Sequence, residues 1–234
     1  FMAKNASDPF CRWDLVQSVW TDVIKQSDVE PALIEGLSQL LLEILRDESL
    51  DMAVKAELLC QPSFDAVAQT FQHVDVEQII KGKERIVKQF AVNNRAVLEG
   101  YLAKLNDIPN GYESTRVAKR RLKQVLMGYL GQIEDESIGE LLMTRLRAST
   151  NMTETISAID AIRVHSLPLL QNCLEQLEQE FAGNVLVLDK ILSTIAKVNS
   201  QQVYDLMQQW SEHSSFSIKN PNRVRALYGA FVMA

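Results

Sequence analysis

The sequence predicts an all-α fold, and three observations support this prediction. Apolar residues recur at three- and four-residue spacing along almost the whole chain, which is the period of a helix with one buried face. No segment shows the sustained alternation of apolar and polar residues that is typical of strands. Hydrophobic residues make up 47% of the 234 residues, which is enough for a continuous core. Stacked antiparallel hairpins of such helices would form an α-solenoid of the HEAT-like or armadillo-like kind, although the sequence shows no repeat of fixed period.

Start and stop signals divide this pattern into about a dozen helices joined by short polar turns. Capping residues predict helix starts at Asp8-Pro9, Ser63, Asp75, Ser114, Asn151, Ser200 and Asn220-Pro221. Proline and glycine predict stops at Pro31, Pro62, Pro109-Asn110-Gly111, Pro168 and Gly183-Asn184. Residues 75–108 lack a clear breaker, so one bent helix or two short ones are both possible, with Lys81-Gly82-Lys83 and Asn93-Asn94 as the weak points.

The turn at residues 109–112 is the best-marked break in the middle of the chain. Apolar periodicity is equally strong on both sides of it, so the turn resembles a connection between two helices more than a domain linker. We therefore expect one helical domain that spans residues 1–234.

The composition excludes several classes of protein. A net charge of −6 and a pI near 5.2 do not provide the concentrated basic surface that nucleic-acid binding needs. The basic residues at 116–123 fall on one predicted helix, where pairing with nearby acids on a solvated face explains them. The three cysteines form no C-x-x-C pair, which favours free thiols in a reducing compartment. Because neither a signal peptide nor an apolar run of about 18 residues is visible, we expect a soluble, cytoplasmic protein without nucleic-acid or membrane partners.

Residues 216–231 form a more distinctive sequence motif than a helix start alone requires. They read F-S-x-x-N-P-N-R-x-R-x-L-x-G-A-F, in which Asn220 can cap a helix and Pro221 suits its first position. The string resembles a segment of the C-terminal helical domain of bacterial aminopeptidase N, the zinc-dependent alanyl aminopeptidase, a metallopeptidase of the gluzincin type. Four further landmarks of that domain occur in the expected order, at residues 5–17, 118–122, 151–154 and 187–190.

Each of these landmarks resembles a short motif of the family. Residues 5–17 resemble the entry motif D-x-F-x-R-W-[DE]-x-x-Q, and residues 118–122 resemble A-x-R-x-L. Residues 151–154 read N-M-T-E, and residues 187–190 fit V-x-D-K, although Ile191 stands where the family usually has Trp. Landmarks in register over nearly the whole chain identify it as most of this C-terminal domain.

The resemblance implies a noncatalytic domain of a zinc aminopeptidase that removes N-terminal amino acids from peptides. The domain would cap the active site and shape an internal cavity for peptides, so its partners would be the catalytic domain of the same chain and peptide substrates. The chain itself lacks H-E-x-x-H, the two histidines and the base that bind and use zinc in such enzymes, because its only histidines are His73, His165 and His213. We therefore predict no catalytic residue, metal ligand or cofactor in this chain, no activity of this chain alone, and zinc in the parent enzyme.

Arg225 is the residue that the resemblance places at the internal cavity, with Asn222 and Arg223 as further candidates. A guanidinium there would bind the C-terminal part or carboxylate of a peptide through paired hydrogen bonds. The alternative is an arginine that pairs with an acid on a neighbouring helix. If Val224, Leu227 and Phe231 form a buried stripe, Arg223 and Arg225 project about 100° to either side of it and cannot both face one cavity.

The departure from the family pattern is that its domain continues through further helices, whereas this sequence stops at Ala234. A solenoid that ends there would leave an apolar face uncovered, so we expect such a truncated fragment to self-associate. A different class of function is also open, namely an independent helical-repeat scaffold that binds a protein partner in its concave face.

Overall fold

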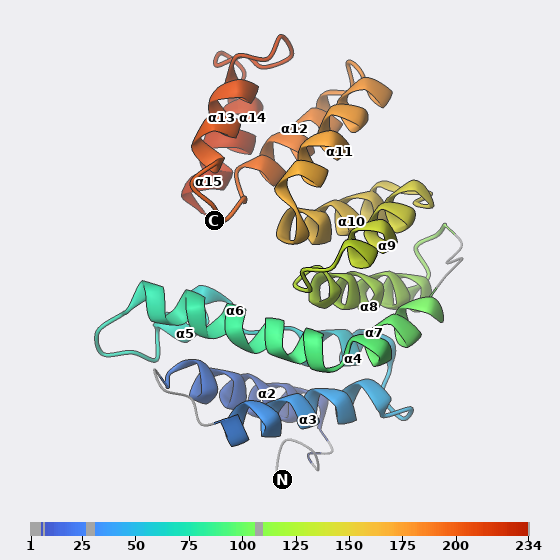
Figure 1. Ribbon diagram of the computed structural model, residues 1–234, viewed down its shortest axis with the longest axis vertical. Coiled ribbons are helices and arrows are strands. Elements are labelled where there is room, and N and C mark those ends of the chain that lie inside the picture. Colours follow the sequence, from blue (N-terminus) through green and yellow to red (C-terminus); the bar gives the residue numbers. More distant parts are fainter. Residues whose placement is uncertain (1–5, 7, 27–30, 106–109, 234) are drawn as a thin grey trace. The chain divides into compact units, whose positions relative to one another are not determined.

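The computed structural model describes residues 6, 8–26, 31–105 and 110–233. All regular elements in these ranges are helices, which confirms the all-α prediction (Figure 1). Asn5, Ser7, Pro109 and Ala234, to which parts of the sequence interpretation refer, lie outside the described residues. The chain forms two compact units, residues 1–133 and 134–234, and each is described here by itself. The expectation of one domain over the whole chain stays a prediction.

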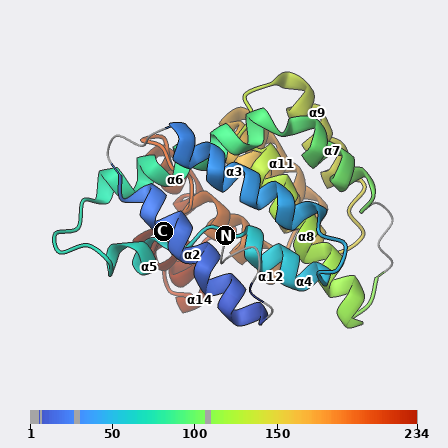
Figure 2. The same cartoon turned by 90° about the horizontal axis from the view of Figure 1, so that it is seen from below.

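The first unit consists of the helices α2 to α8. Their bounds are Pro9–Ile24 for α2, Pro31–Arg46 for α3, Met52–Leu59 for α4, Phe64–Ala68 for α5, Val76–Asn93 for α6, Arg95–Ala103 for α7 and Ser114–Leu130 for α8. Helix α8 packs against α4, α6 and α7, and α2 packs against α3, α4 and α6 (Figure 2). Each helix thereby buries one apolar face against its neighbours.

Aromatic residues fill the core of the first unit. The rings of Phe90 in α6 and Tyr129 in α8 meet edge to face, with their centroids 4.9 Å apart. The Tyr129 hydroxyl donates to the carbonyl of Leu59 in the last turn of α4, at 2.6 Å. Gly82 lies where α6 crosses α2, and a Cβ there would approach the Ile24 carbonyl oxygen to 3.1 Å. The missing side chain therefore allows a close helix crossing, and Gly82 does not break α6.

The second unit consists of α9 to α15. Their bounds are Glu136–Arg147 for α9, Met152–His165 for α10, Leu167–Glu180 for α11, Val185–Ile195 for α12, Val203–Ser211 for α13, Pro221–Val224 for α14 and Ala230–Val232 for α15, with a π-helical turn at Arg225–Gly229. Consecutive helices from α9 to α13 pack against one another in chain order. This neighbour-on-neighbour packing is typical of helical-repeat folds.

Capping residues account for most helix boundaries. Side chains of Asp8, Ser63, Asp75, Asn151 and Asn220 accept backbone hydrogen bonds at the predicted starts of α2, α5, α6, α10 and α14. The start predicted at Ser200 is wrong, because α13 begins at Val203. The start at Ser114 is one residue off as a cap, since Glu113 holds the cap position.

Residues 75–103 form two helices, α6 and α7, and the break lies at Asn94. The Asn94 amide group donates to the Phe90 carbonyl at 2.9 Å, and the Asn94 backbone N–H donates to the same carbonyl at 3.1 Å, so Asn94 closes the end of α6 with both its backbone and its side chain. None of the helices in the described residues is both long and apolar enough to cross a membrane.

Candidate functional site

The C-terminal string folds as its sequence predicts at its start. The Asn220 side chain accepts a hydrogen bond from the backbone N–H of Asn222 at 3.0 Å, and Pro221 occupies the first helical position of α14. Helix α14 then runs into the π-helical turn Arg225–Gly229. Because a π turn holds more residues than an α turn, the side chains after Val224 lie at angles that an α-helical wheel does not predict.

Arg223 and Asp189 form an ion pair inside the second unit. Only 4% of the Arg223 side chain is exposed, against 24% of the Asp189 side chain. Asp189 comes from the V-x-D-K segment in α12 and Arg223 from the N-P-N-R segment in α14, so the pair joins two of the landmarks found in the sequence. Arg223 also borders a cavity of about 240 Å³ with apolar walls that include Phe181, Val187 and Ile191.

Arg225 and Asn222 lie in a different environment, because both are exposed at the surface of the second unit. The predicted stripe is buried only at Leu227, while Val224 and Phe231 are half-exposed, so the prediction of three residues buried together is wrong for two of them. The π turn gives the reason, since it changes the angle between successive side chains. A role of Arg225, Asn222 or Arg223 in lining a peptide cavity stays a prediction.

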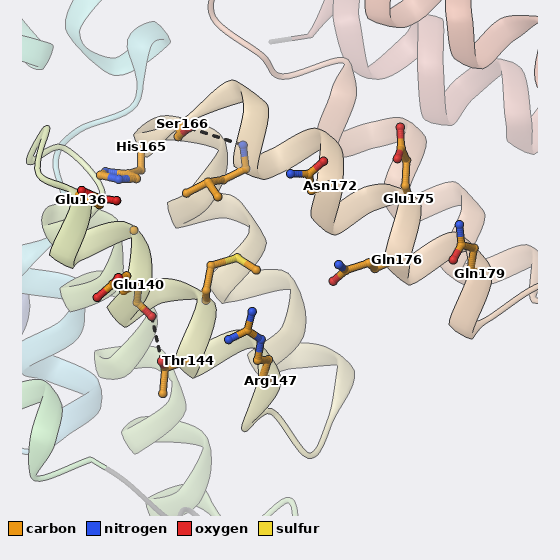
Figure 3. A pocket seen from close by; sticks show the side chains of 13 residues that line it. Glu136, Glu140, Thr144, Arg147, His165, Ser166, Asn172, Glu175, Gln176 and Gln179 are labelled. Carbon is orange, nitrogen blue, oxygen red and sulfur yellow. Dashed lines mark hydrogen bonds between the residues drawn. The ribbon is translucent and has the colours of Figure 1, made fainter.

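A larger concavity lies between α9 and α11, and we call it the α9–α11 groove (Figure 3). Its volume is about 920 Å³. From α9 it is lined by Glu136, Gly139, Glu140, Met143, Thr144 and Arg147, and from the α10 end and α11 by His165, Ser166, Leu169, Asn172, Glu175, Gln176 and Gln179. All of these residues belong to the second unit, and ten of the thirteen have polar or charged side chains.

Close packing shapes the floor of the α9–α11 groove. A Cβ on Gly139 would come within 3.0 Å of Nε2 of His165 and within 3.1 Å of Leu169, so the glycine lets the imidazole lie against α9. The Cys173 thiol contacts the Met143 sulfur at 3.3 Å and ties α11 to α9 below the groove. Nδ1 of His165 is buried and has no hydrogen-bond partner among the described residues.

The rim of the groove carries polar groups that the fold does not use. Asn172, Gln176 and Gln179 are exposed, and the described part of the chain gives their side chains no hydrogen-bond partner. The lining holds three glutamates against one arginine, which is a net charge of −2 with His165 neutral. The groove is therefore an acidic surface with spare donors and acceptors.

The described residues provide no cluster of metal ligands, and two of the three thiols are poor nucleophiles. Among the described residues, no three His, Cys, Asp or Glu side chains gather in a way that could hold a metal ion, so these residues do not fit a zinc site. Burial raises the pKa of the Cys60 thiol, even though Arg121 opposes the shift. Burial likewise raises the pKa of Cys173, against the opposing charge of Arg147. Both thiols therefore stay protonated and are poor nucleophiles at neutral pH.

Sequence reasoning missed the α9–α11 groove. Its residues come from three helices, and each looks ordinary alone, because glutamates on α9 and carboxamides on α11 are also what a solvated helix face contains. The i, i+4, i+7 spacing of Asn172, Gln176 and Gln179 was the one available signal. That spacing shows a shared face but not which neighbour lies opposite.

Comparison with known proteins gives one family over the whole chain. The family model described as "Domain of unknown function (DUF3458_C) ARM repeats" matches residues 1–234. Aminopeptidase N of Escherichia coli (strain K12) is 28% identical over 240 residues, and aminopeptidase N of Haemophilus influenzae (strain ATCC 51907 / DSM 11121 / KW20 / Rd) is 24% identical over 244 residues. These matches cover 99% and 98% of this chain but only 27% of each relative, so the chain spans about a quarter of their length.

A solved structure has the same fold. The crystal structure of Legionella pneumophila aminopeptidase A in complex with aspartic acid superposes with a TM-score of 0.84 at 22% identity, over 99% of this chain and 28% of that one. The resemblance to the C-terminal helical domain of aminopeptidase N is thus confirmed over nearly the full length. Because the family model matches every residue, this chain belongs to the DUF3458_C family of ARM-repeat domains.

Proposed function

We propose that this chain is a noncatalytic domain of a zinc-dependent aminopeptidase that removes N-terminal amino acids from peptides. In that enzyme the domain would pack against the catalytic domain, cap the active site and shape the cavity that holds the peptide. The observation that carries the proposal is the match to aminopeptidase N over 99% of this chain, which accounts for only 27% of the relative. Because the described residues do not fit a zinc site, the ion would be held by another part of the parent protein.

The contrast between Arg223 and Arg225 supports a division of roles within the proposed cavity wall. The Arg223 guanidinium already pairs with Asp189, and this ion pair holds α14 against α12. Arg225 is exposed two residues later, so its guanidinium is available to a carboxylate. We therefore propose Arg225, with Asn222 beside it, as the peptide-facing part of this segment and Arg223 as its support.

The complete gene from which this sequence comes tests whether the chain is a domain of a zinc-dependent aminopeptidase. A segment with H-E-x-x-H in the same reading frame, and hydrolysis of aminoacyl amides by the complete product with one zinc per molecule, is the expected result. A complete gene product without such a segment contradicts the proposal.

The role of Arg225 is tested in that complete enzyme. Arg225→Ala should lower kcat/KM for an oligopeptide by about ten-fold or more, because a charged hydrogen bond contributes roughly 1.5 to 3 kcal/mol. A single-residue chromogenic amide is too short to reach the arginine, so its kcat/KM should stay nearly unchanged. Equal effects on both substrates would assign Arg225 a purely structural role.

A scaffold that binds a protein partner is the second candidate function, and the α9–α11 groove is the observation that favours it. A groove of about 920 Å³ with spare polar groups is large enough for a peptide segment of such a partner. The two functions differ in the complete gene product, since a scaffold has no need of a metallopeptidase segment.

A further inference from the structure

Three carboxamide side chains form a row along α11. Asn172, Gln176 and Gln179 are spaced i, i+4, i+7, so they lie on one face of the helix, and all three line the α9–α11 groove (Figure 3). Each amide group offers both donors and an acceptor, and none is used by another described residue. The row therefore presents a mixed line of free hydrogen-bonding groups.

The dimensions of this row match an extended peptide. Gln179 lies seven positions after Asn172, which is a rise of about 10 Å along α11. About three residues of an extended chain cover the same distance. A peptide backbone displays alternating N–H and C=O groups, and a carboxamide is the side chain that can donate to one and accept from the other.

The charge and shape of the groove select the kind of peptide. Glu136 and Glu140 stand on α9 and Glu175 on α11, against Arg147 alone, so basic side chains are favoured. Met143 and Leu169 on the floor suit the aliphatic stem of a lysine or arginine whose charged end reaches a carboxylate. The lining contains no Phe, Tyr or Trp on which a base could stack, and its net charge repels phosphates.

We propose that the α9–α11 groove binds an extended oligopeptide with basic side chains, with the backbone held by Asn172, Gln176 and Gln179 and the side chains by Glu136 and Glu140. The inference rests on the proposed function in one respect, because a domain of an aminopeptidase meets peptides. It goes further by naming the residues that bind the peptide and the charge that they select.

The 234-residue chain itself tests this proposal, with fluorescence anisotropy of two labelled probes. One probe is an alanine peptide with lysine at alternate positions, and the other has glutamate at those positions. We expect saturable binding of the lysine probe with a Kd below about 1 mM, and binding of the glutamate probe that is at least about ten-fold weaker.

Variants separate the groove from the rest of the surface. Gln176→Ala removes one backbone partner and should weaken binding of the lysine probe about two- to ten-fold, and Glu140→Gln should reduce the preference for the lysine probe by a similar factor. The matched controls are Gln171→Ala and Glu180→Gln, which alter residues of α11 outside the lining and should leave both probes unaffected.

Two results would overturn the proposal. One is no saturable binding of the lysine probe by the unaltered chain, and the other is an equal loss of binding in Gln176→Ala and Gln171→Ala. Neither result bears on hydrolysis by the complete gene product. A failure of the groove is therefore distinguishable from a failure of the proposed aminopeptidase function.

Discussion

Two sets of three carboxamide side chains, one set in each unit of this protein, differ in the hydrogen bonds that they make. In the first unit Gln17 donates to the Cys60 carbonyl at 2.9 Å, Gln78 to the Lys25 carbonyl at 2.6 Å and Asn94 to the Phe90 carbonyl at 2.9 Å. In the second unit Asn172, Gln176 and Gln179 have no such bond among the described residues.

Helix ends explain this difference. The three acceptors in the first unit all lie in the last turn or at the C-cap of a helix, where the intrahelical pattern ends. The Phe90 carbonyl also accepts the Asn94 backbone N–H at 3.1 Å, whereas Cys60 and Lys25 are C-cap residues, whose carbonyls lie beyond the helix. Carbonyls in the body of a helix such as α11 already accept a hydrogen bond four residues on. A carboxamide that faces open space from α11 is therefore not needed by the fold and is available to a ligand.

The largest expected loss of stability comes from breaking the ion pair between Arg223 and Asp189, which holds α14 against α12. Asp189→Asn keeps the shape of the side chain but leaves the buried Arg223 guanidinium without its counter-charge, which should destabilise the second unit by about 3 kcal/mol or more. Urea unfolding measures the change. Arg225→Ala is the control, and as a surface substitution it should stay within about 0.5 kcal/mol of the unaltered chain. A similar loss in both variants would refute the distinction between the two arginines.

A smaller effect is expected in the first unit from Tyr129→Phe. The substitution removes the hydroxyl that donates to the buried Leu59 carbonyl and should lower the free energy of unfolding by about 1 to 2 kcal/mol at neutral pH. An unchanged urea midpoint would mean that the hydrogen bond contributes nothing.

The same residue gives a pH dependence. Burial raises the pKa of Tyr129 above its ordinary value near 10, so the folded chain keeps the phenolic proton where the unfolded chain loses it. Stability from this source is complete below about pH 10 and is lost as the pH rises further. The urea midpoint should therefore fall less between about pH 8 and about pH 10.5 in Tyr129→Phe than in the unaltered chain. Parallel falls in the two proteins would contradict this assignment.

The smallest expected change in stability comes from removing one carboxamide in each unit. Gln17→Ala leaves the Cys60 carbonyl without its side-chain donor and should cost about 1 kcal/mol of stability, whereas Gln176→Ala should change stability by less than about 0.5 kcal/mol. Thermal unfolding followed by circular dichroism compares the two variants. Equal losses would show that the α11 carboxamides serve the fold after all.

Most of the fold could be predicted from local signals. Ser63, Asp75, Asn151 and Asn220 cap helices where the sequence indicated, because a side-chain oxygen two or three residues before a free N–H is a local arrangement. The start predicted at Ser200 failed because residues 200–203 form a turn ahead of α13, in which the Val203 N–H donates to the Ser200 carbonyl at 3.0 Å.

The candidate site was far less predictable, because it depends on tertiary neighbours. Nothing local indicates that Arg223 pairs with Asp189, 34 residues away, or that Arg225 two positions later is exposed. The π turn after Val224 also moved Phe231 out of the predicted stripe. A glycine such as Gly139 usually weakens a helix, yet the missing side chain here leaves room for His165 at the groove floor.

The most direct test of the contrast between the two units is nuclear magnetic resonance of the side-chain amide groups during titration with the lysine probe. We predict that the NH₂ signals of Asn172, Gln176 and Gln179 shift in a saturable way, while those of Gln17, Gln78 and Asn94 stay in place because the fold already holds them. Shifts of the signals from the first-unit carboxamides, or no shift of the signals from the α11 carboxamides, would contradict the claim that the α11 carboxamides bind a peptide.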